Sequence, residues 1–229
     1  MSAAVPSPGK RRGVGRLPRG RHGLPRAFVV SNQRERIIDA LAVVCAAKGY
    51  SAVTVEDVIA QAGVSRRTFY DLFSSKQECF LVAYELVMDR VVRAVERSYA
   101  SEDCEWPQRM TRLLRTLLSQ LAAEPELSRL VMVDVLAAGQ AALERRDAAL
   151  RRFEVFFNAG AMELPLPDQE RRLLARAVIG GLAEALYNRM VTGETDRLPD
   201  AGPDLLYCML VPYLGHNRAR AASAQWAGR

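Results

Sequence analysis

Residues 54–73 constrain the fold of this chain most, because two short helical segments meet there at a glycine. Thr54 stands where a helix cap is expected, and Asp57, three residues later, can complete a capping box. Gly63 follows the first segment, at a point where the chain must turn and where glycine accepts a left-handed backbone at little cost. Ser65 can then cap a second helix. The stretch therefore predicts two helices joined by a tight turn.

The second of these helices has a basic and polar outer face. Phe69 and Phe73 return to an apolar face at helical spacing. The side chains left to point elsewhere are Arg66, Arg67, Thr68 and Tyr70. A helix of this kind can enter the major groove of DNA, so the pattern is typical of a helix-turn-helix. An ordinary helical hairpin with solvated arginines is the alternative interpretation.

The rest of the sequence predicts an all-α protein. Long segments are rich in Ala, Leu, Arg and Glu, with few strand-like alternations, and 49% hydrophobic residues can form a substantial core. Breaks at glycine and proline separate the expected helices. Their ranges are about 31–48, 76–100, 106–123, 126–136, 141–158, 168–191 and 203–214, with Pro212 interrupting or straining the last.

These patterns divide the chain into four parts. Residues 1–30 are rich in Gly, Pro, Ser and Arg and are expected to form a flexible basic arm. Residues 31–75 are expected to form a three-helix DNA-binding domain that contains the helix-turn-helix. Residues 76–216 are expected to form a larger helical domain, and residues 217–229 a flexible tail.

The charge is concentrated at the N-terminal end. Residues 1–36 hold nine Lys and Arg against Glu35 alone, a net charge of +8, which leaves −2 for the rest of a chain whose total is +6. A basic arm on a nearly neutral body indicates a polyanionic partner. DNA fits better than a membrane, because the arm lacks the apolar face of an interfacial helix. Whether the arm contacts DNA at all stays open.

The residues for enzymatic chemistry are missing. His22 lies in the arm and His216 near the C-terminal end, and neither has a partner expected of a general base or a metal ligand. No phosphate loop or nucleophile elbow occurs. We therefore expect no enzyme activity, no cofactor and no metal. The four cysteines have no paired spacing, and no secretory or transmembrane segment is visible, so a cytoplasmic location is expected.

Residues 34–80, about a fifth of the chain, resemble the DNA-binding segment of the TetR family of transcriptional regulators. The matching positions are Gly49-Tyr50, Thr54-Val55, Ile59-Ala60, Ala62-Gly63-Val64-Ser65, Thr68-Phe69-Tyr70, Phe73 and Lys76. The resemblance implies a homodimer that reads a palindromic operator with one recognition helix per subunit, as a ligand-responsive repressor. A sequence-tolerant architectural DNA-binding protein that relies on the basic arm is the alternative.

The resemblance also implies roles for individual residues. Thr54, Tyr70 and Lys76 are expected to contact phosphates, and Ser65, Arg66, Arg67 and Thr68 to face the groove. The last two helices are expected to form the dimer interface. Their apolar stripes are Ala175, Val178, Ile179, Leu182, Leu186 and Met190, with Gly180 and Gly181 allowing close approach, and Leu205, Leu206, Met209 and Leu210. Completion of an intramolecular core is the alternative role of these stripes.

A ligand site is a further expectation of the resemblance. Apolar residues that could line its cavity are Met110, Leu114, Met132, Leu136, Phe153 and Phe157, with Asn158, Tyr187 or Asn188 as polar groups that orient a ligand. Such a stripe is also common in a plain core. The sequence identifies no effector.

Overall fold

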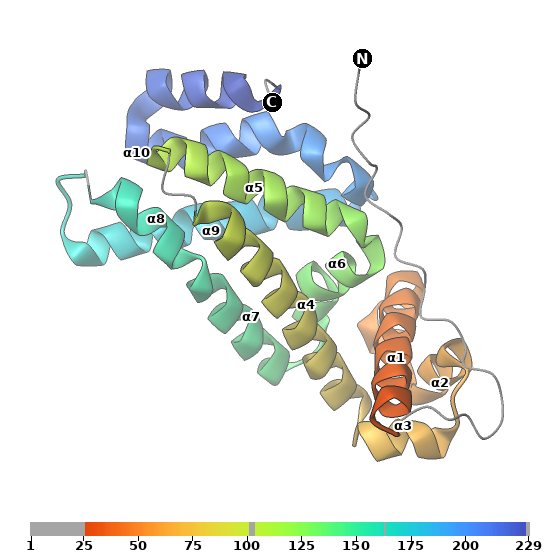
Figure 1. The fold of residues 1–229 in the computed structure, drawn as a ribbon. Helices are drawn as coiled ribbons and strands as arrows, with labels where there is room; N and C mark the ends of the chain where they lie inside the picture. Colours follow the sequence, from red (N-terminus) through yellow and green to blue (C-terminus); the bar gives the residue numbers. More distant parts are fainter. Residues whose placement is uncertain (1–25, 101–103, 163, 228–229) are drawn as a thin grey trace.

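The computed structural model describes residues 26–100, 104–162 and 164–227. Regular structure in these ranges is helical throughout, without a strand, so the all-α prediction is confirmed (Figure 1). The first 25 residues of the predicted basic arm lie outside the described ranges.

The N-terminal domain lies at one end of the molecule (Figure 1). It consists of α1 (Arg26–Lys48), a 3₁₀ turn η1 (Tyr50–Ala52), α2 (Val55–Ala62) and α3 (Arg66–Leu72). Helix α1 begins at Arg26, five residues earlier than predicted, so Ser31 lies inside the helix. The Ser31 hydroxyl donates to Glu35, one turn further along the same helix, at 3.4 Å.

A compact apolar core joins these helices to the next one. Ile37 and Leu41 of α1 are fully buried, as are Phe69 of α3 and Phe80. The rings of Phe69 and Phe73 lie 5.8 Å apart. Burial of these aromatic groups stabilises the domain and fixes the rotation of α3 about its axis.

Helix α4 leads from this domain into the larger one (Figure 1). The remaining elements are α4 (Lys76–Tyr99), α5 (Trp106–Ala123), α6 (Pro125–Met132), η2 (Asp134–Ala137), α7 (Gln140–Arg152), α8 (Glu154–Ala161), α9 (Asp168–Val191), η3 (Thr195–Ala201), α10 (Gly202–Ala224) and η4 (Gln225–Ala227). The bounds of α5 and α9 agree with the sequence prediction.

Two predicted helices are each divided in the structure. The segment 126–136 leaves the α-helical path after Met132, and the segment 141–158 is broken at Phe153. Long-range contacts hold the second of these segments. The carbonyl oxygen of Phe156 accepts hydrogen bonds from the Tyr99 hydroxyl at 3.2 Å and the Trp106 indole at 2.9 Å. Local sequence patterns do not encode such bonds.

Residues 217–227 are helical, which corrects the prediction of a flexible tail after His216 for this part of the segment. Helix α10 continues to Ala224, and its backbone is non-helical at Gly215 (φ 73°, ψ 170°) rather than at Pro212. The chain then folds back along the molecule (Figure 1). The indole of Trp226 packs so closely on Gly202 that an added Cβ atom would overlap it. Tertiary packing, which the local composition does not reveal, therefore orders this segment.

Candidate nucleic-acid interface

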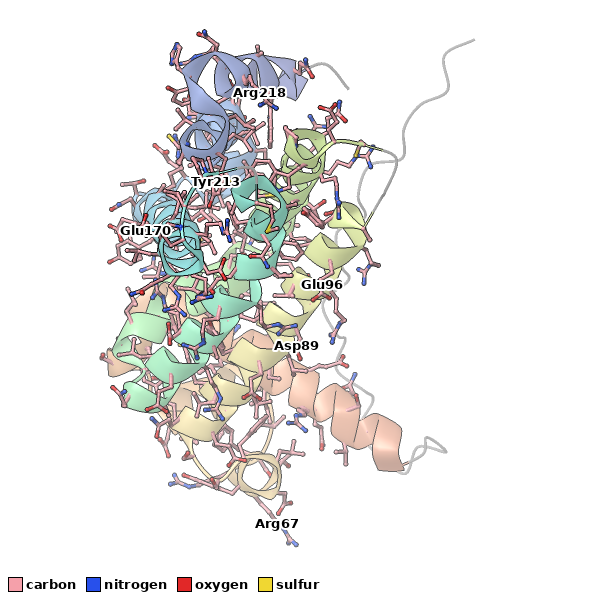
Figure 2. All side chains as sticks on the ribbon, turned by 90° about the vertical axis from the view of Figure 1, so that its left-hand side faces the viewer. Arg67, Asp89, Glu96, Glu170, Tyr213 and Arg218 are labelled. Carbon is pink, nitrogen blue, oxygen red and sulfur yellow. The ribbon has the colours of Figure 1, made fainter. Side chains whose placement is uncertain are left out.

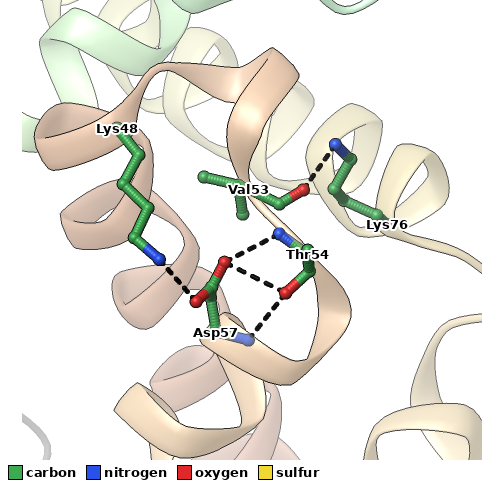
Figure 3. Close-up of polar contacts among 5 residues, drawn as sticks. All are labelled: Lys48, Val53, Thr54, Asp57 and Lys76. Atoms are coloured by element: carbon green, nitrogen blue, oxygen red, sulfur yellow. Dashed lines mark hydrogen bonds and ion pairs between the residues drawn. The ribbon is translucent and has the colours of Figure 1, made fainter.

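The start of α2 is fixed by a capping box (Figure 3). The Thr54 hydroxyl oxygen accepts a hydrogen bond from the Asp57 amide at 3.2 Å, and the Asp57 carboxylate accepts from the Thr54 amide at 3.0 Å. The ammonium of Lys48, at the end of α1, lies 2.6 Å from the same carboxylate. The hydrogen bond from Lys48, together with those from Thr54, lowers the pKa of Asp57 to about 2. The expected helix cap is thus present, and α1 is tied to it.

The turn between α2 and α3 is held by the first helix. Gly63 has a left-handed backbone (φ 63°, ψ 40°), as the sequence predicts for this position. The guanidinium of Arg36 donates hydrogen bonds to the carbonyl oxygens of Ala62 and Gly63. The sequence predicts no such role for Arg36, because the two acceptors lie 26 and 27 residues away and no local pattern connects them with Arg36.

Helix α3 presents the residues that were predicted to meet DNA. The Ser65 hydroxyl accepts a hydrogen bond from the Thr68 amide at 3.0 Å and lies 2.8 Å from the Thr68 hydroxyl. Phe69 is fully buried, whereas Tyr70 is 44% exposed. Anchoring by Phe69 turns the opposite face of the helix, which carries Arg67, toward solvent, and Arg66 is also exposed.

The two arginines of α3 differ in their surroundings. Arg66 forms an ion pair with Glu56 of α2, and its guanidinium lies 5.5 Å from the centre of the Tyr70 ring. Arg67 is 91% exposed, and Asp71 approaches it only to 3.9 Å. Figure 2 shows Arg67 projecting from the end of the molecule that lies farthest from Arg218. Of these two arginines, Arg67 is therefore the more available to a ligand outside the protein.

Lys76, a predicted phosphate contact, is engaged within the protein. Its ammonium donates to the carbonyl oxygen of Tyr50 at 2.9 Å. It also donates to the carbonyl oxygen of Val53 at 2.7 Å (Figure 3). It also lies 4.2 Å from the centre of the Tyr50 ring. An ammonium has three donors, so two are occupied. Lys76 thus braces the chain between α1 and α2, and a contact with phosphate stays a prediction.

The larger domain contains an apolar cavity of about 60 Å³. It is lined by Met88, Val91, Leu113, Leu117, Leu121, Met132, Leu150, Phe153, Phe157, Ile179, Leu182, Ala183, Leu186 and Met209. The structure therefore brings together three predicted ligand-site residues, which are Met132, Phe153 and Phe157. Met110 and Leu114 are fully buried but do not line this cavity, and neither does Tyr187.

Three other predicted ligand-site residues lie on the surface, which corrects their assignment. Leu136 is 44% exposed, because the chain departs from the expected helix before it. Asn158 is also exposed. The side-chain amide of Asn188 donates to Glu184, on the exposed side of α9. None of the described residues that line the cavity is polar, so the expected polar groups for orienting a ligand are not found among them.

The apolar stripes of the last two helices belong to the core of the chain. The buried members are Ala175, Ile179, Leu186, Met190, Leu205, Leu206, Met209 and Leu210. Val178 and Leu182 are partly buried and pack against them. Other residues form the exposed faces: Leu173, Ala177, Gly180, Gly181, Glu184, Asn188 and Val191 on α9, and Asp204, Cys208 and Pro212 on α10. The intramolecular alternative therefore describes most of the predicted stripe.

Two further properties concern the described part of the chain. No described helix is both long and apolar enough to cross a membrane. Within residues 26–100, 104–162 and 164–227, no cluster of three His, Cys, Asp or Glu side chains could hold a metal ion.

A braced helix-turn-helix at one end and an apolar cavity within a helical body define a DNA-binding regulator. Residues 37–83 match the family described as bacterial regulatory proteins, tetR family. The N-terminal domain is therefore a DNA-binding domain of the TetR type.

Solved structures share the fold across most of the chain. The fatty acid degradation regulator FadR from Bacillus halodurans has a TM-score of 0.68 at 20% identity, over 81% of this chain and 96% of that one. FadR from Bacillus subtilis, in complex with stearoyl-CoA, has a TM-score of 0.65 at 18% identity, over 79% and 97%. Among related sequences, the nucleoid occlusion factor SlmA of Idiomarina loihiensis is 25% identical over 173 residues, which cover 73% of this chain and 88% of that protein.

Proposed function

We propose that the protein is a homodimeric, ligand-responsive repressor that binds a palindromic operator and reads bases with Arg67. The observation that carries the proposal is the presentation of Arg67, which is 91% exposed on a helix anchored by the buried Phe69. A guanidinium can bind the O6 and N7 atoms of guanine together, which discriminates against other bases by about 1–3 kcal/mol. Thr54 and Tyr70, both exposed nearby, are suited to phosphate contacts.

The proposed dimer forms through the exposed faces of α9 and α10. Gly180 and Gly181 lie in the middle of α9, where glycine costs a helix about 1 kcal/mol relative to alanine. Apart from the nearby backbone of α9 itself, no atom of the described residues would lie within 4 Å of a Cβ atom added at either position, so intramolecular packing does not explain the glycines. Close approach of a second copy does explain them. Exposed Leu173 and Val191 supply apolar area at the two ends of the same helix.

The proposed effector is an apolar molecule, because only apolar residues line the cavity. The stearoyl-CoA complex of the Bacillus subtilis FadR supports an acyl chain as one candidate. A volume of about 60 Å³ is small beside the roughly 300–1,000 Å³ of common ligand pockets. A ligand must therefore enlarge the cavity and displace its walls. Met88 and Val91 place α4 among these walls, and the first residue of α4 is Lys76, which braces the DNA-binding domain.

Selection of fragmented genomic DNA by the purified protein tests this function. The comparison variant carries Arg66→Ala and Arg67→Ala, and its charge-matched control carries Arg93→Ala and Arg218→Ala. Both control residues are exposed and lie in the larger domain. We expect a palindromic motif with the wild type and the control, and its loss in the comparison variant. Recovery of unrelated fragments by all three proteins contradicts the proposal and favours sequence-tolerant binding.

The position of the recovered sites separates repression from a second candidate, nucleoid occlusion, which the 25% identical relative suggests. Sites that overlap promoters support repression. Palindromic sites distributed without regard to promoters favour the second candidate.

A further inference from the structure

A buried carboxylate links the two domains. Asp134 lies in η2 of the larger domain and is only 4% exposed. Its Oδ1 atom accepts a hydrogen bond at 3.0 Å from the backbone amide of Tyr50, which lies 84 residues earlier, in the DNA-binding domain. The bond therefore joins two elements that the sequence keeps far apart.

Burial of this carboxylate costs free energy. Its second oxygen, Oδ2, is buried without a hydrogen-bond partner in the described structure. Burial raises the pKa of Asp134, although the hydrogen bond from Tyr50 and the charge of Arg129 oppose this effect. A buried, half-satisfied carboxylate destabilises a fold, so its presence indicates a role other than stability. The purpose that its geometry indicates is to hold Tyr50.

Tyr50 occupies the joint between α1 and α2. While Asp134 holds its amide, the ammonium of Lys76 holds its carbonyl oxygen at 2.9 Å. Its ring packs edge-on against Phe80 of α4, with the ring centres 4.8 Å apart. Lys76 also binds the carbonyl of Val53, directly before the helix cap of α2 (Figure 3). These contacts fix the position of Tyr50 in space. They thereby constrain the placement of α2 and, through the turn at Gly63, the orientation of α3.

The other end of this link reaches the cavity. Met132 lines the cavity and is the last residue of α6, and one residue separates it from Asp134. A ligand that displaces the backbone at Met132 also moves or strains the adjoining η2 turn. The contact between Asp134 and Tyr50 is thus placed to transmit such a displacement to the DNA-binding domain.

We propose that Asp134 is a positioning residue for DNA binding, which sets the orientation of the DNA-binding domain relative to the larger domain. In a homodimer this orientation determines the distance between the two α3 helices, and so the spacing of half-sites that the protein accepts. The inference rests on the proposed function as a dimeric operator-binding protein.

The test measures affinity for a series of duplexes in which the two selected half-sites are separated by different numbers of base pairs. The proteins are the wild type, Asp134→Ala, Asp134→Asn and Ser128→Ala. Asparagine keeps an oxygen that can accept the Tyr50 amide. Ser128 is a matched control, because it is buried in the same domain and donates to Leu121 at 2.7 Å without contacting Tyr50.

We expect the wild type, Asp134→Asn and Ser128→Ala to prefer one spacing at least tenfold. Asp134→Ala is expected to bind all spacings within about threefold and random DNA as the wild type does. A wild-type spacing profile in Asp134→Ala overturns the inference. So does a flat profile in Asp134→Asn or in Ser128→Ala, because the loss would then not depend on this hydrogen bond.

A measurement on the wild type alone covers the case in which Asp134→Ala does not fold. Hydrogen exchange of the Tyr50 amide should be as slow as that of buried helical amides, and exchange at the rate of exposed amides overturns the inference. A wild type that shows no preferred motif or spacing would instead refute the proposed function.

Discussion

The ammonium of Lys48 lies 2.6 Å from the carboxylate of Asp57, which ties the end of α1 to the first turn of α2. The same carboxylate completes the capping box with Thr54 (Figure 3). The arrangement of two helices of the DNA-binding domain thus depends on one charged group, and pH can test its contribution.

We expect Asp57 to stabilise the fold only while it is ionised. Its pKa is lowered from 3.8 to about 2, so its contribution is complete above the unfolded-state pKa and is lost as the pH falls through the folded-state pKa. Denaturant unfolding of the wild type and Asp57→Asn should therefore differ by a constant amount from pH 7 to about pH 5, and the difference should shrink between about pH 4 and pH 2. An unchanged difference at pH 2 would refute this account.

Arg67→Ala should weaken operator binding more than binding to random DNA. Loss of one bidentate guanine contact corresponds to roughly 5- to 150-fold in affinity. Fluorescence anisotropy with operator and scrambled duplexes at one salt concentration measures both affinities. Arg218→Ala, which removes the same charge at the opposite end of the molecule (Figure 2), is the control. Equal losses on the two duplexes would assign Arg67 to a phosphate contact instead.

Glu56→Gln should strengthen DNA binding. Glu56 forms an ion pair with Arg66, the first residue of α3. The substitution therefore releases the guanidinium of Arg66 and removes a negative charge that repels phosphate. We expect affinity for both duplexes to rise about two- to fivefold at low salt, with a smaller gain at high salt. Glu144→Gln, an exposed position on α7, should have no effect. A decrease in affinity would show that the ion pair orients Arg66 productively.

Gly180→Leu should dissociate the dimer without unfolding the subunit. Leucine is favoured over glycine in a helix by about 1 kcal/mol, and within one chain its Cβ atom meets open space. Sedimentation equilibrium should therefore show a folded monomer. Ala148→Leu, at an exposed position on α7, is the control and should stay dimeric. A dimeric Gly180→Leu variant would exclude this face of α9 as the interface.

Gly202→Ala should destabilise the chain by about 1–3 kcal/mol, because the new methyl group overlaps the indole of Trp226. Glu144→Ala, at an exposed position on α7, is the control and should change stability little. Urea unfolding compares the two variants. Equal stability would mean that the C-terminal segment does not dock as the structure shows.

Local patterns were sufficient to predict the helix-turn-helix and the bounds of α5 and α9. The capping box at Thr54, the left-handed Gly63 and the cap at Ser65 each depend on residues within a few positions, so the sequence contains all that is needed to recognise them. Helical periodicity likewise requires only neighbouring residues.

Long-range packing determined the features that the sequence did not reveal. The bond between Asp134 and Tyr50 joins positions 84 residues apart, and Trp226 docks on Gly202 from beyond a kink. Periodicity identifies an apolar face of α9 but not what covers it, and the structure shows that most of this face is buried within the chain itself. Local energetics therefore fixes where helices begin and end, whereas the choice of which faces meet depends on packing free energy summed over residues distant in sequence.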